Sequence, residues 1–175
     1  MAKVVVAYPK FNKKDFDWIQ SIRKESDILY YKVIKPHFTI VFPVFTEINN
    51  KDLVNHVKQK SKNQKPFDIS LEKAVINDDA FSDYWHTFLT PKKGYQEIIN
   101  LHDQLYTGLL EPELRKDIPF IPHVGIANDL NKDSMSKLVD KINQNGVKIT
   151  GEIDSLNVCD FIDDKINFVD KVNFK

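Results

Sequence analysis

The sequence of 175 residues is poor in several features that would each point to a class of protein. It has one cysteine, Cys159, which excludes an internal disulfide and any zinc site built from several cysteines. The setting of Cys159 in SLNVCDFI is typical of a strand residue rather than of a reactive thiol. There are two arginines, Arg23 and Arg115, so a guanidinium can clamp a phosphate in at most two places.

An excess of one charge is also missing. Lys plus Arg and Asp plus Glu number 25 each, so no overall field draws the chain to nucleic acid or to acidic membranes. The opening MAKVVVAYP lacks the apolar core of a signal peptide, and no stretch approaches the ~20 apolar residues that cross a bilayer. We therefore expect a cytoplasmic protein with no membrane partner.

What the chain does contain is enough apolar material for a core, and a repeated order of elements. Hydrophobic residues make up 42% of it, which suits one domain or two tightly joined lobes. Periodicity and Gly/Pro punctuation predict the order strand, helix, strand, helix, strand pair in each half. The first half has strands at 4–9 and 37–44, helices at 12–26 and about 50–62, and a strand pair beginning at 67. The second half has strands at 84–91 and 123–128, helices at 94–110 and about 132–144, and strands within 147–162 and 165–174.

Two of these strands open in the same unusual way, with PHFTI in the first half and PHVGI in the second. Side chains alternate between the faces of a strand, so His37 shares a face with Thr39, and His123 shares a face with Gly125. In each half the opposite, apolar face can pack under helices. The histidine face is then left free.

The repeat predicts an α+β fold of two pseudo-symmetric lobes, each an antiparallel-rich sheet with helices on the outside, and a cleft between the sheets. We treat residues 1–175 as a single bilobal domain with repeat halves of roughly 1–80 and 81–175, an order compatible with strand exchange between the lobes. If the lobes pack about a pseudo-twofold axis, His37 and His123 meet across the cleft. Such a pair of lobes completes its site without a second chain, so we expect a monomer with no obligate protein partner.

The other histidines have simpler interpretations. His56 and His102 lie on predicted helices beside charged neighbours, and we expect both to be solvated. His86 lies in a strand that could face the cleft, but it has no counterpart in the other half, so we expect a satisfied polar residue. His37 and His123 differ because both follow a proline at equivalent positions of a repeat, which a structural need alone rarely imposes on a titratable ring.

Two facing imidazoles permit three chemistries. Zinc requires three or four ligands, and no third His, Cys or carboxylate recurs beside either strand. A histidine nucleophile leaves the second ring and Thr39 without a task. General acid and base catalysis uses every part, because an imidazole with a pKa of about 6.5 can be neutral in one ring and charged in the other near neutral pH. The pattern favours metal-free cleavage of a phosphodiester.

Together the two motifs resemble those of the two-histidine (2H) phosphoesterase superfamily, whose bacterial members are known as 2'-5' RNA ligases or cyclic nucleotide phosphodiesterases. Its signature is a pair of His-x-Thr/Ser motifs flanked by hydrophobic residues, and the resemblance covers nearly the whole chain. It implies opening of 2',3'-cyclic or 2'-5' phosphodiester bonds of RNA ends or nucleotides, with no metal or cofactor. It also implies that His37 and His123 act as acid and base and that Thr39 holds the phosphate.

The fourth position departs from this signature, because Gly125 has no hydroxyl. A hydrogen bond to a charged group contributes about 1.5–3 kcal/mol, so its loss lowers turnover about 10- to 100-fold. Each histidine contributes about 10²–10⁴-fold, so we expect a weakened or retuned enzyme. A second interpretation is that Gly125 leaves a gap that admits substrate bulk or lets a backbone N–H approach the phosphate. The alternative is a module that binds RNA ends or nucleotides with weak or no turnover.

Further substrate contacts are expected near the ends of the strands. Lys10 and Lys92 follow equivalent strands and are candidates for the phosphate, although solvated lysines are common in a lysine-rich chain. Arg115 precedes the second motif by a short loop and can supply a bidentate contact. Tyr8 and Trp85 lie where an aromatic ring can stack a base, although core packing is the commoner role.

Overall fold

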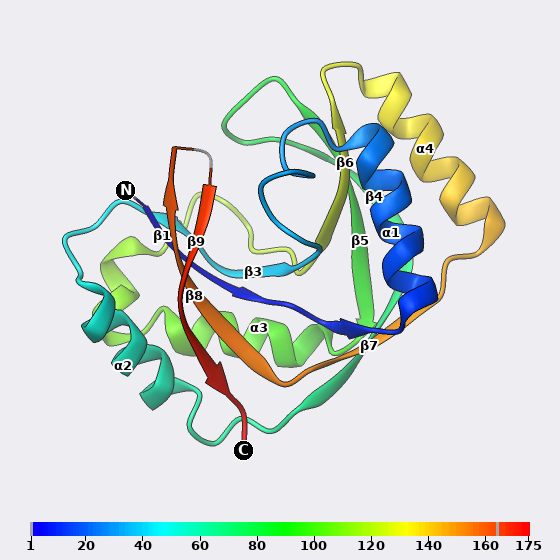
Figure 1. Cartoon of the computed structure of the whole chain (residues 1–175). Helices are drawn as coiled ribbons and strands as arrows, with labels where there is room; N and C mark the ends of the chain where they lie inside the picture. Colours follow the sequence, from blue (N-terminus) through cyan, green and yellow to red (C-terminus); the bar gives the residue numbers. More distant parts are fainter. Residues whose placement is uncertain (1, 164) are drawn as a thin grey trace.

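The computed structural model describes residues 2–163 and 165–175, and in this part of the chain the strands form two antiparallel sheets (Figure 1). The strands are β1 (Ala2–Ala7), β2 (Lys10–Phe11), β3 (Phe38–Val44), β4 (Phe67–Asp78), β5 (Trp85–Lys93), β6 (Val124–Asp129), β7 (Ile149–Ile153), β8 (Ser155–Ile162) and β9 (Lys165–Asn173). The helices are α1 (Lys13–Ser26), α2 (Asn50–Lys60), α3 (Tyr95–Leu105) and α4 (Lys132–Asn145), with a 3-10 helix η1 (Gly108–Glu113). The predicted fold class is confirmed. The predicted order of elements is wrong in the first half, where the single long strand β4 stands in place of the expected strand pair and is bonded to β5 and β7. The short strand β2 was not expected either.

Residues at the helix ends explain where the helices begin and stop. Asn12 and Asn131 precede α1 and α4 and accept hydrogen bonds from backbone N–H groups of the first turn, which satisfies donors that a helix leaves free. Gly146 ends α4 with a φ of 70°, which glycine adopts without strain. The helix predicted over 94–110 is shorter in the structure, because Gly108 takes a φ of 64° and begins η1.

The two sheets share one internal order. The first runs β3-β1-β8-β9, and the second contains the matching run β6-β5-β4-β7 with β2 added at its far edge. Each sheet draws on both halves of the chain, since β8 and β9 complete the sheet of β1 and β3, while β4 lies beside β5. The strands that follow the two histidines, β3 and β6, therefore lie at equivalent edges of different sheets.

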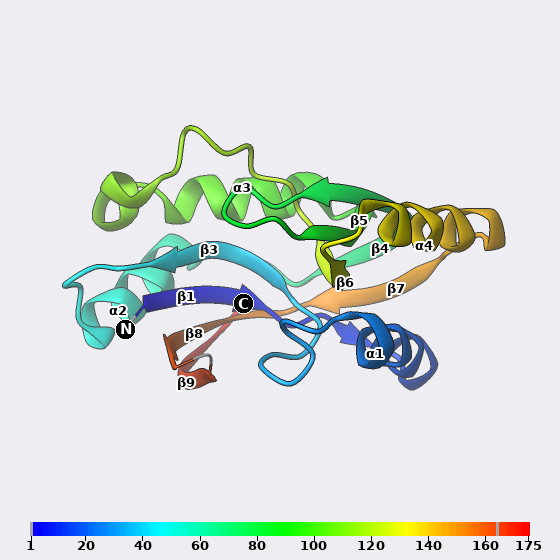
Figure 2. The ribbon, with the colours of Figure 1, turned by 90° about the horizontal axis from the view of Figure 1, so that it is seen from above.

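Helices cover the apolar faces of both sheets. α2 and α3 pack on the first sheet, and α1 and α4 pack on the second, so α1 and α4 lie together on one side of the molecule (Figures 1 and 2). The buried side chains between these layers form one continuous core that includes Phe38 and Ile40 of β3 and Val124 and Ile126 of β6. The alternating residues of β3 and β6 consequently face away from the helices. Within the described residues, no helix is long and apolar enough to span a bilayer.

Candidate active site

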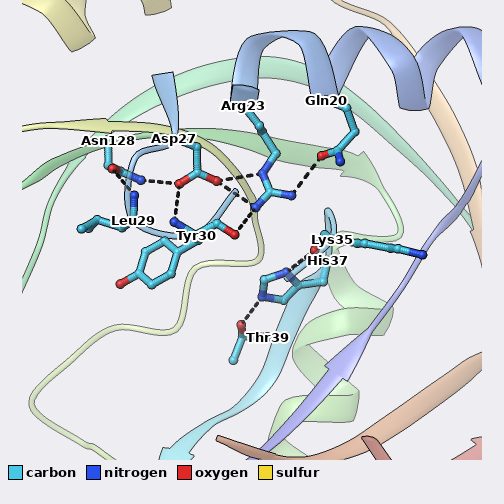
Figure 3. Close-up of polar contacts among 9 residues, drawn as sticks. All are labelled: Gln20, Arg23, Asp27, Leu29, Tyr30, Lys35, His37, Thr39 and Asn128. Carbon is cyan, nitrogen blue, oxygen red and sulfur yellow. Dashed lines mark hydrogen bonds and ion pairs between the residues drawn. The ribbon is translucent and has the colours of Figure 1, made fainter. Parts of the chain in front are cut away.

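His37 is oriented by the backbone just ahead of β3. Its ring atom Nδ1 lies 2.8 Å from the carbonyl oxygen of Lys35. A carbonyl can only accept, so Nδ1 carries the proton and Nε2 keeps its lone pair. The Thr39 hydroxyl lies 3.1 Å from Nε2 and donates to it (Figure 3). The first motif thus presents a ring nitrogen and a hydroxyl side by side.

His123 is oriented in the same way ahead of β6. Its Nδ1 donates to the carbonyl oxygen of Ile121 at 2.6 Å, again two residues back. Gly125 stands where the first motif has Thr39, and Nε2 of His123 has no hydrogen-bond partner among the described residues. The φ of Gly125 is not in the left-handed region, and a Cβ built there would meet no atom within 4 Å. Neither the backbone nor packing requires glycine, and the position opens onto free space.

The two imidazoles lie close enough to influence each other. Burial is the main cause that lowers the pKa of both His37 and His123 to about 4, while the Nδ1 hydrogen bonds act in the opposite direction. A charge on His123 lowers the pKa of His37, as does the charge of Arg23. Both rings are therefore neutral in the free protein at neutral pH. The sequence predicts one neutral and one charged ring, because the desolvation that removes the charge is not visible in a motif.

Stacked rings support His123 and not His37. The His123 ring lies nearly parallel to Phe88 of β5, with the ring centroids 3.6 Å apart. Phe88 also stacks on His86, at 5.6 Å. The Nε2 atom of His86 lies 3.2 Å from a carboxylate oxygen of Asp79, so His86 is the satisfied polar residue that the sequence predicts. It also acts on the site, since its charge lowers the pKa of His123.

The two predicted aromatic contacts lie in different places. Tyr8, just after β1, is half-buried and has its ring centroid 6.2 Å from that of His37. Burial raises the pKa of Tyr8 to about 12, so its hydroxyl keeps its proton and remains a donor. Trp85 begins β5, where the Nζ atom of Lys132 in α4 lies 4.2 Å from its ring centroid. The structure therefore brings Tyr8 to the first motif and places Trp85 against α4.

The two predicted lysines are exposed and paired with acids. Lys10 lies in β2, at the opposite edge of the second sheet from β6, and its Nζ atom is 2.5 Å from Asp154. Lys92 lies near the end of β5, with Nζ 3.2 Å from Glu72. Exposed ion pairs of this kind contribute little to stability and break readily. The structure does not bring Lys10 to the histidines, and phosphate binding by either lysine stays a prediction.

Arg115 is also committed to an acidic neighbour. Its Nε and Nη2 atoms lie 2.9 and 2.6 Å from the two carboxylate oxygens of Asp117, and its guanidinium lies 5.1 Å from the centroid of the Phe81 ring. A phosphate would have to displace this bidentate carboxylate. A role for Arg115 in binding stays a prediction.

The expectation that His56 and His102 are solvated is wrong. Both side chains are buried, with 7% and 4% exposed. His56 Nε2 lies 2.8 Å from the carbonyl oxygen of Leu105, and His102 Nδ1 lies 2.8 Å from that of Ile40. The His102 ring also stacks on Phe120, with centroids 3.7 Å apart. The apolar stripe of each helix, rather than its charged sequence neighbours, decided which way these rings point.

Sequence reasoning missed Arg23. It is 1% exposed on α1, and its guanidinium forms an ion pair with Asp27 at 2.8 Å (Figure 3). The available signal was the spacing of an arginine and an aspartate four residues apart at the end of a helix. No group of three or more His, Cys, Asp or Glu within the described ranges could hold a metal ion.

The chain is similar in sequence to a known family and to individual known proteins. The family model described as the 2'-5' RNA ligase superfamily matches residues 11–165. A protein of Bacillus licheniformis named as a putative phosphoesterase is 29% identical over 136 residues, which cover 77% of this chain and 75% of that protein. A protein of Oceanobacillus iheyensis with the same designation is 23% identical over 150 residues, covering 85% and 84%.

Solved structures share the fold. Escherichia coli LigT complexed with 3'-AMP has a TM-score of 0.63 at 10% identity, covering 99% of this chain and 98% of that one. Usb1 of Kluyveromyces marxianus has a TM-score of 0.61 at 6% identity, with the same coverage. The family match confirms the resemblance that the two histidine motifs predict.

Proposed function

The chain belongs to the 2'-5' RNA ligase superfamily, and on that basis we propose that it opens 2',3'-cyclic or 2'-5' phosphodiester bonds of RNA ends or nucleotides. It is a phosphoesterase of the two-histidine type. In the proposed reaction His37 and His123 carry the protons and Thr39 binds the phosphate. Neither a metal nor a cofactor takes part.

One observation carries this proposal. His37 and His123 each donate from Nδ1 to the carbonyl two residues back, so both Nε2 atoms are the ones left to act. The two rings also lie within electrostatic reach of each other. Acid and base catalysis requires two titratable groups that reach one substrate, directly or through one water. This arrangement supports proton exchange on opposite sides of a phosphate.

The proton balance of the step is simple. Water attacks phosphorus while one Nε2 removes a proton from it, and the bond from phosphorus to the 2' or 3' oxygen breaks. The other imidazole gives its proton to that leaving oxygen. A phosphomonoester and a free hydroxyl result, with the proton passed from one ring to the other.

The acid must be protonated before it can act, although both pKa values are about 4 in the free protein. An anion placed between the rings favours their charged form and raises the pKa. Substrate binding therefore brings a proton with it. Because LigT binds 3'-AMP, we use 3'-AMP as a non-reacting probe. Its binding should take up close to one proton at pH 7, measured by calorimetry in buffers of different ionisation enthalpy.

The hydroxyl of Thr39 is the second element of the proposed site. In the free protein it donates to Nε2 of His37, and in the complex it rotates to donate to a phosphate oxygen. Gly125 supplies no such donor. By the hydrogen-bond magnitude of about 1.5–3 kcal/mol, one missing donor slows turnover about 10- to 100-fold and does not abolish it.

The test is direct. The protein is incubated in EDTA with a 2',3'-cyclic mononucleotide and, separately, with a 2'-5'-linked dinucleotide, and the products are followed by phosphorus NMR. Ring opening or cleavage that persists in EDTA and is lost in His37→Ala and His123→Ala supports the proposal. Binding without any cleavage would instead favour the binding module, and inhibition by EDTA would contradict the metal-free mechanism.

A further inference from the structure

Hydrogen bonds join the start of the segment that leads to His37 to β6, the strand that follows His123. Asp27 follows the last residue of α1, and its Oδ1 atom accepts a hydrogen bond from Asn128 Nδ2 at 2.5 Å. Asn128 lies in β6, and its Oδ1 atom accepts from the backbone N–H of Leu29 at 3.2 Å. A parallel bridge also joins Asp27 to Asn128. Figure 3 shows these side chains and His37 on neighbouring segments.

A buried guanidinium holds the other side of Asp27. Nε and Nη2 of Arg23 each lie 2.8 Å from Asp27 Oδ2. The remaining donors of Arg23 reach Gln20 Oε1 and the carbonyl oxygen of Tyr30, both at 3.1 Å. Asp27 Oδ1 also accepts from the backbone N–H of Tyr30 at 3.0 Å. The guanidinium and the carboxylate of this bridge are both hydrogen-bonded, as buried charges require.

From these contacts we infer that Arg23, Asp27 and Asn128 form a bridge that sets the spacing between the two histidines. The inference rests on the proposed function, since it treats the pair as the working groups. The bridge ties the segment preceding His37, which enters the first sheet, to β6, which follows His123 in the second sheet. It touches neither imidazole, so its members are positioning residues.

The chemistry of the bridge favours positioning over stability alone. A buried ion pair is often matched or exceeded in stability by apolar side chains of similar volume, whereas its hydrogen bonds demand one geometry. That demand matters here because a displacement of about 1 Å between reacting groups can cost about 100-fold in rate. The bridge therefore acts on proton transfer, while the proposed phosphate contact of Thr39, which follows His37 by two residues, is kept.

The first experiment compares two asparagines. Asn128→Ala cuts the tie between β6 and the start of the segment that leads to His37, and it leaves the Arg23–Asp27 pair in place. Asn143→Ala is the control, because Asn143 also makes two side-chain hydrogen bonds, at 2.9 Å to the N–H and carbonyl of Ala74, and joins α4 to β4 within one lobe. We expect kcat on a 2',3'-cyclic nucleotide to fall about 10- to 100-fold in Asn128→Ala with little change in KM. Equal kcat losses in both variants, at similar losses of thermal stability, would overturn the inference.

The second experiment needs no turnover. Removing a charge near His37 raises its pKa, so His123→Gln should raise the pKa of His37 measured by NMR titration of the ring. The same replacement made on the Asn128→Ala background should raise it less, because the rings have moved apart. Arg23 of α1 and Tyr8 beside β1, which also face His37, stay unchanged in every variant.

The two readouts separate the two ideas. If no phosphodiester is cleaved but the coupling between the rings drops in Asn128→Ala, the proposed function fails and the bridge stands. If cleavage occurs and both kcat and the coupling are unchanged in Asn128→Ala, the bridge fails and the function stands. Identical coupling in wild type and Asn128→Ala contradicts the bridge in either case.

Discussion

The two histidine motifs are alike in how they orient a ring and different in what surrounds it. His37 and His123 both donate from Nδ1 to the carbonyl two residues back. The Nε2 atom of His37 accepts a hydrogen bond from the hydroxyl of Thr39. Around His123 the same atom has no hydrogen-bond partner among the described residues, and the ring is stacked on Phe88.

This difference shows what the hydroxyl is for. His123 keeps the same tautomer and the same backbone contact without a hydroxyl at Gly125, so a hydroxyl at this position is not needed to orient the ring. The carbonyl contact provides orientation in both motifs, which leaves the hydroxyl of Thr39 available for the phosphate contact that we propose.

Removing the imidazole of either motif should have the largest effect on turnover. His37→Ala and His123→Ala should each lower kcat by about 10²–10⁴-fold, because each removes one proton carrier. The double variant should lose little more than either single variant, since groups that work as a unit are not additive. Initial rates on a 2',3'-cyclic nucleotide measure this. His56→Gln is the control. Wild-type rates in His37→Ala and His123→Ala would refute the assignment of these residues as acid and base.

Removing the hydroxyl from the first motif, or adding one to the second, tests the difference between the two motifs. Thr39→Val should lower kcat about 10- to 100-fold, and Gly125→Thr should raise it by up to the same factor on a small cyclic nucleotide. A Cβ at position 125 has no atom within 4 Å, so the first atom of the new side chain meets no clash. Should Gly125→Thr instead weaken binding of a longer RNA end and leave the small substrate unchanged, the glycine is a gap for substrate bulk.

The double variant Thr39→Gly/Gly125→Thr carries the hydroxyl from one motif to the other. If either hydroxyl can serve the phosphate, its rate should recover to within about tenfold of wild type, above the rate of Thr39→Val. A double variant as slow as Thr39→Val would show that only the first motif holds the phosphate.

Acid should destabilise the protein through both rings alike. The folded pKa of each histidine is about 4 and the unfolded value is about 6.5, so between these values the unfolded chain binds more protons. The free energy of unfolding should therefore fall as the pH falls from about 6.5 to about 4. Urea titrations at pH 7 and pH 5 measure it, with a loss of about 2 kcal/mol for each ring and about 4 kcal/mol for the pair. His37→Gln/His123→Gln should lose less over the same range, and an unchanged slope would contradict the pKa values.

The stacked ring should matter to one motif only. Phe88→Leu removes a stacking contact worth about 0.5–1.5 kcal/mol, so kcat should fall about 2- to 10-fold through looser placement of His123. Phe67→Leu, which loses a remote stack on Phe174 at 6.4 Å, is the control. NMR titration should show a changed pKa for His123 and the wild-type pKa for His37, and a shift of His37 alone would reverse this interpretation.

Local signals in the sequence were sufficient to predict which residues share a face of the two histidine strands. The alternation that places Thr39 with His37 and Gly125 with His123 depends only on the strand period, as does the burial of Phe38 and Val124 on the opposite face. The same rule places Trp85 and its neighbour His86 on opposite faces of β5.

The remainder depends on contacts between distant parts of the chain. No period reveals that β8 pairs with β1 or that β7 pairs with β4, because partner choice is decided by tertiary packing. The charge state of His37 depends on burial, and the bridge of Arg23 depends on a strand a hundred residues later, where Asn128 reaches Asp27. The site residues were therefore visible in the motifs, but their electrostatics and their spacing were not.

The pairing of β1 with β8 has a consequence for how the protein is made. Lys3 and Asp160 form a buried ion pair at 3.0 Å although they are 157 residues apart. On the ribosome β1 and the His37 motif emerge early, yet the sheet that fixes them waits for its neighbour strand to be synthesised. Contacts of such high contact order form slowly, because a long loop must close before they stabilise anything. The growing chain thus carries the His37 motif before the sheet that positions this motif is complete.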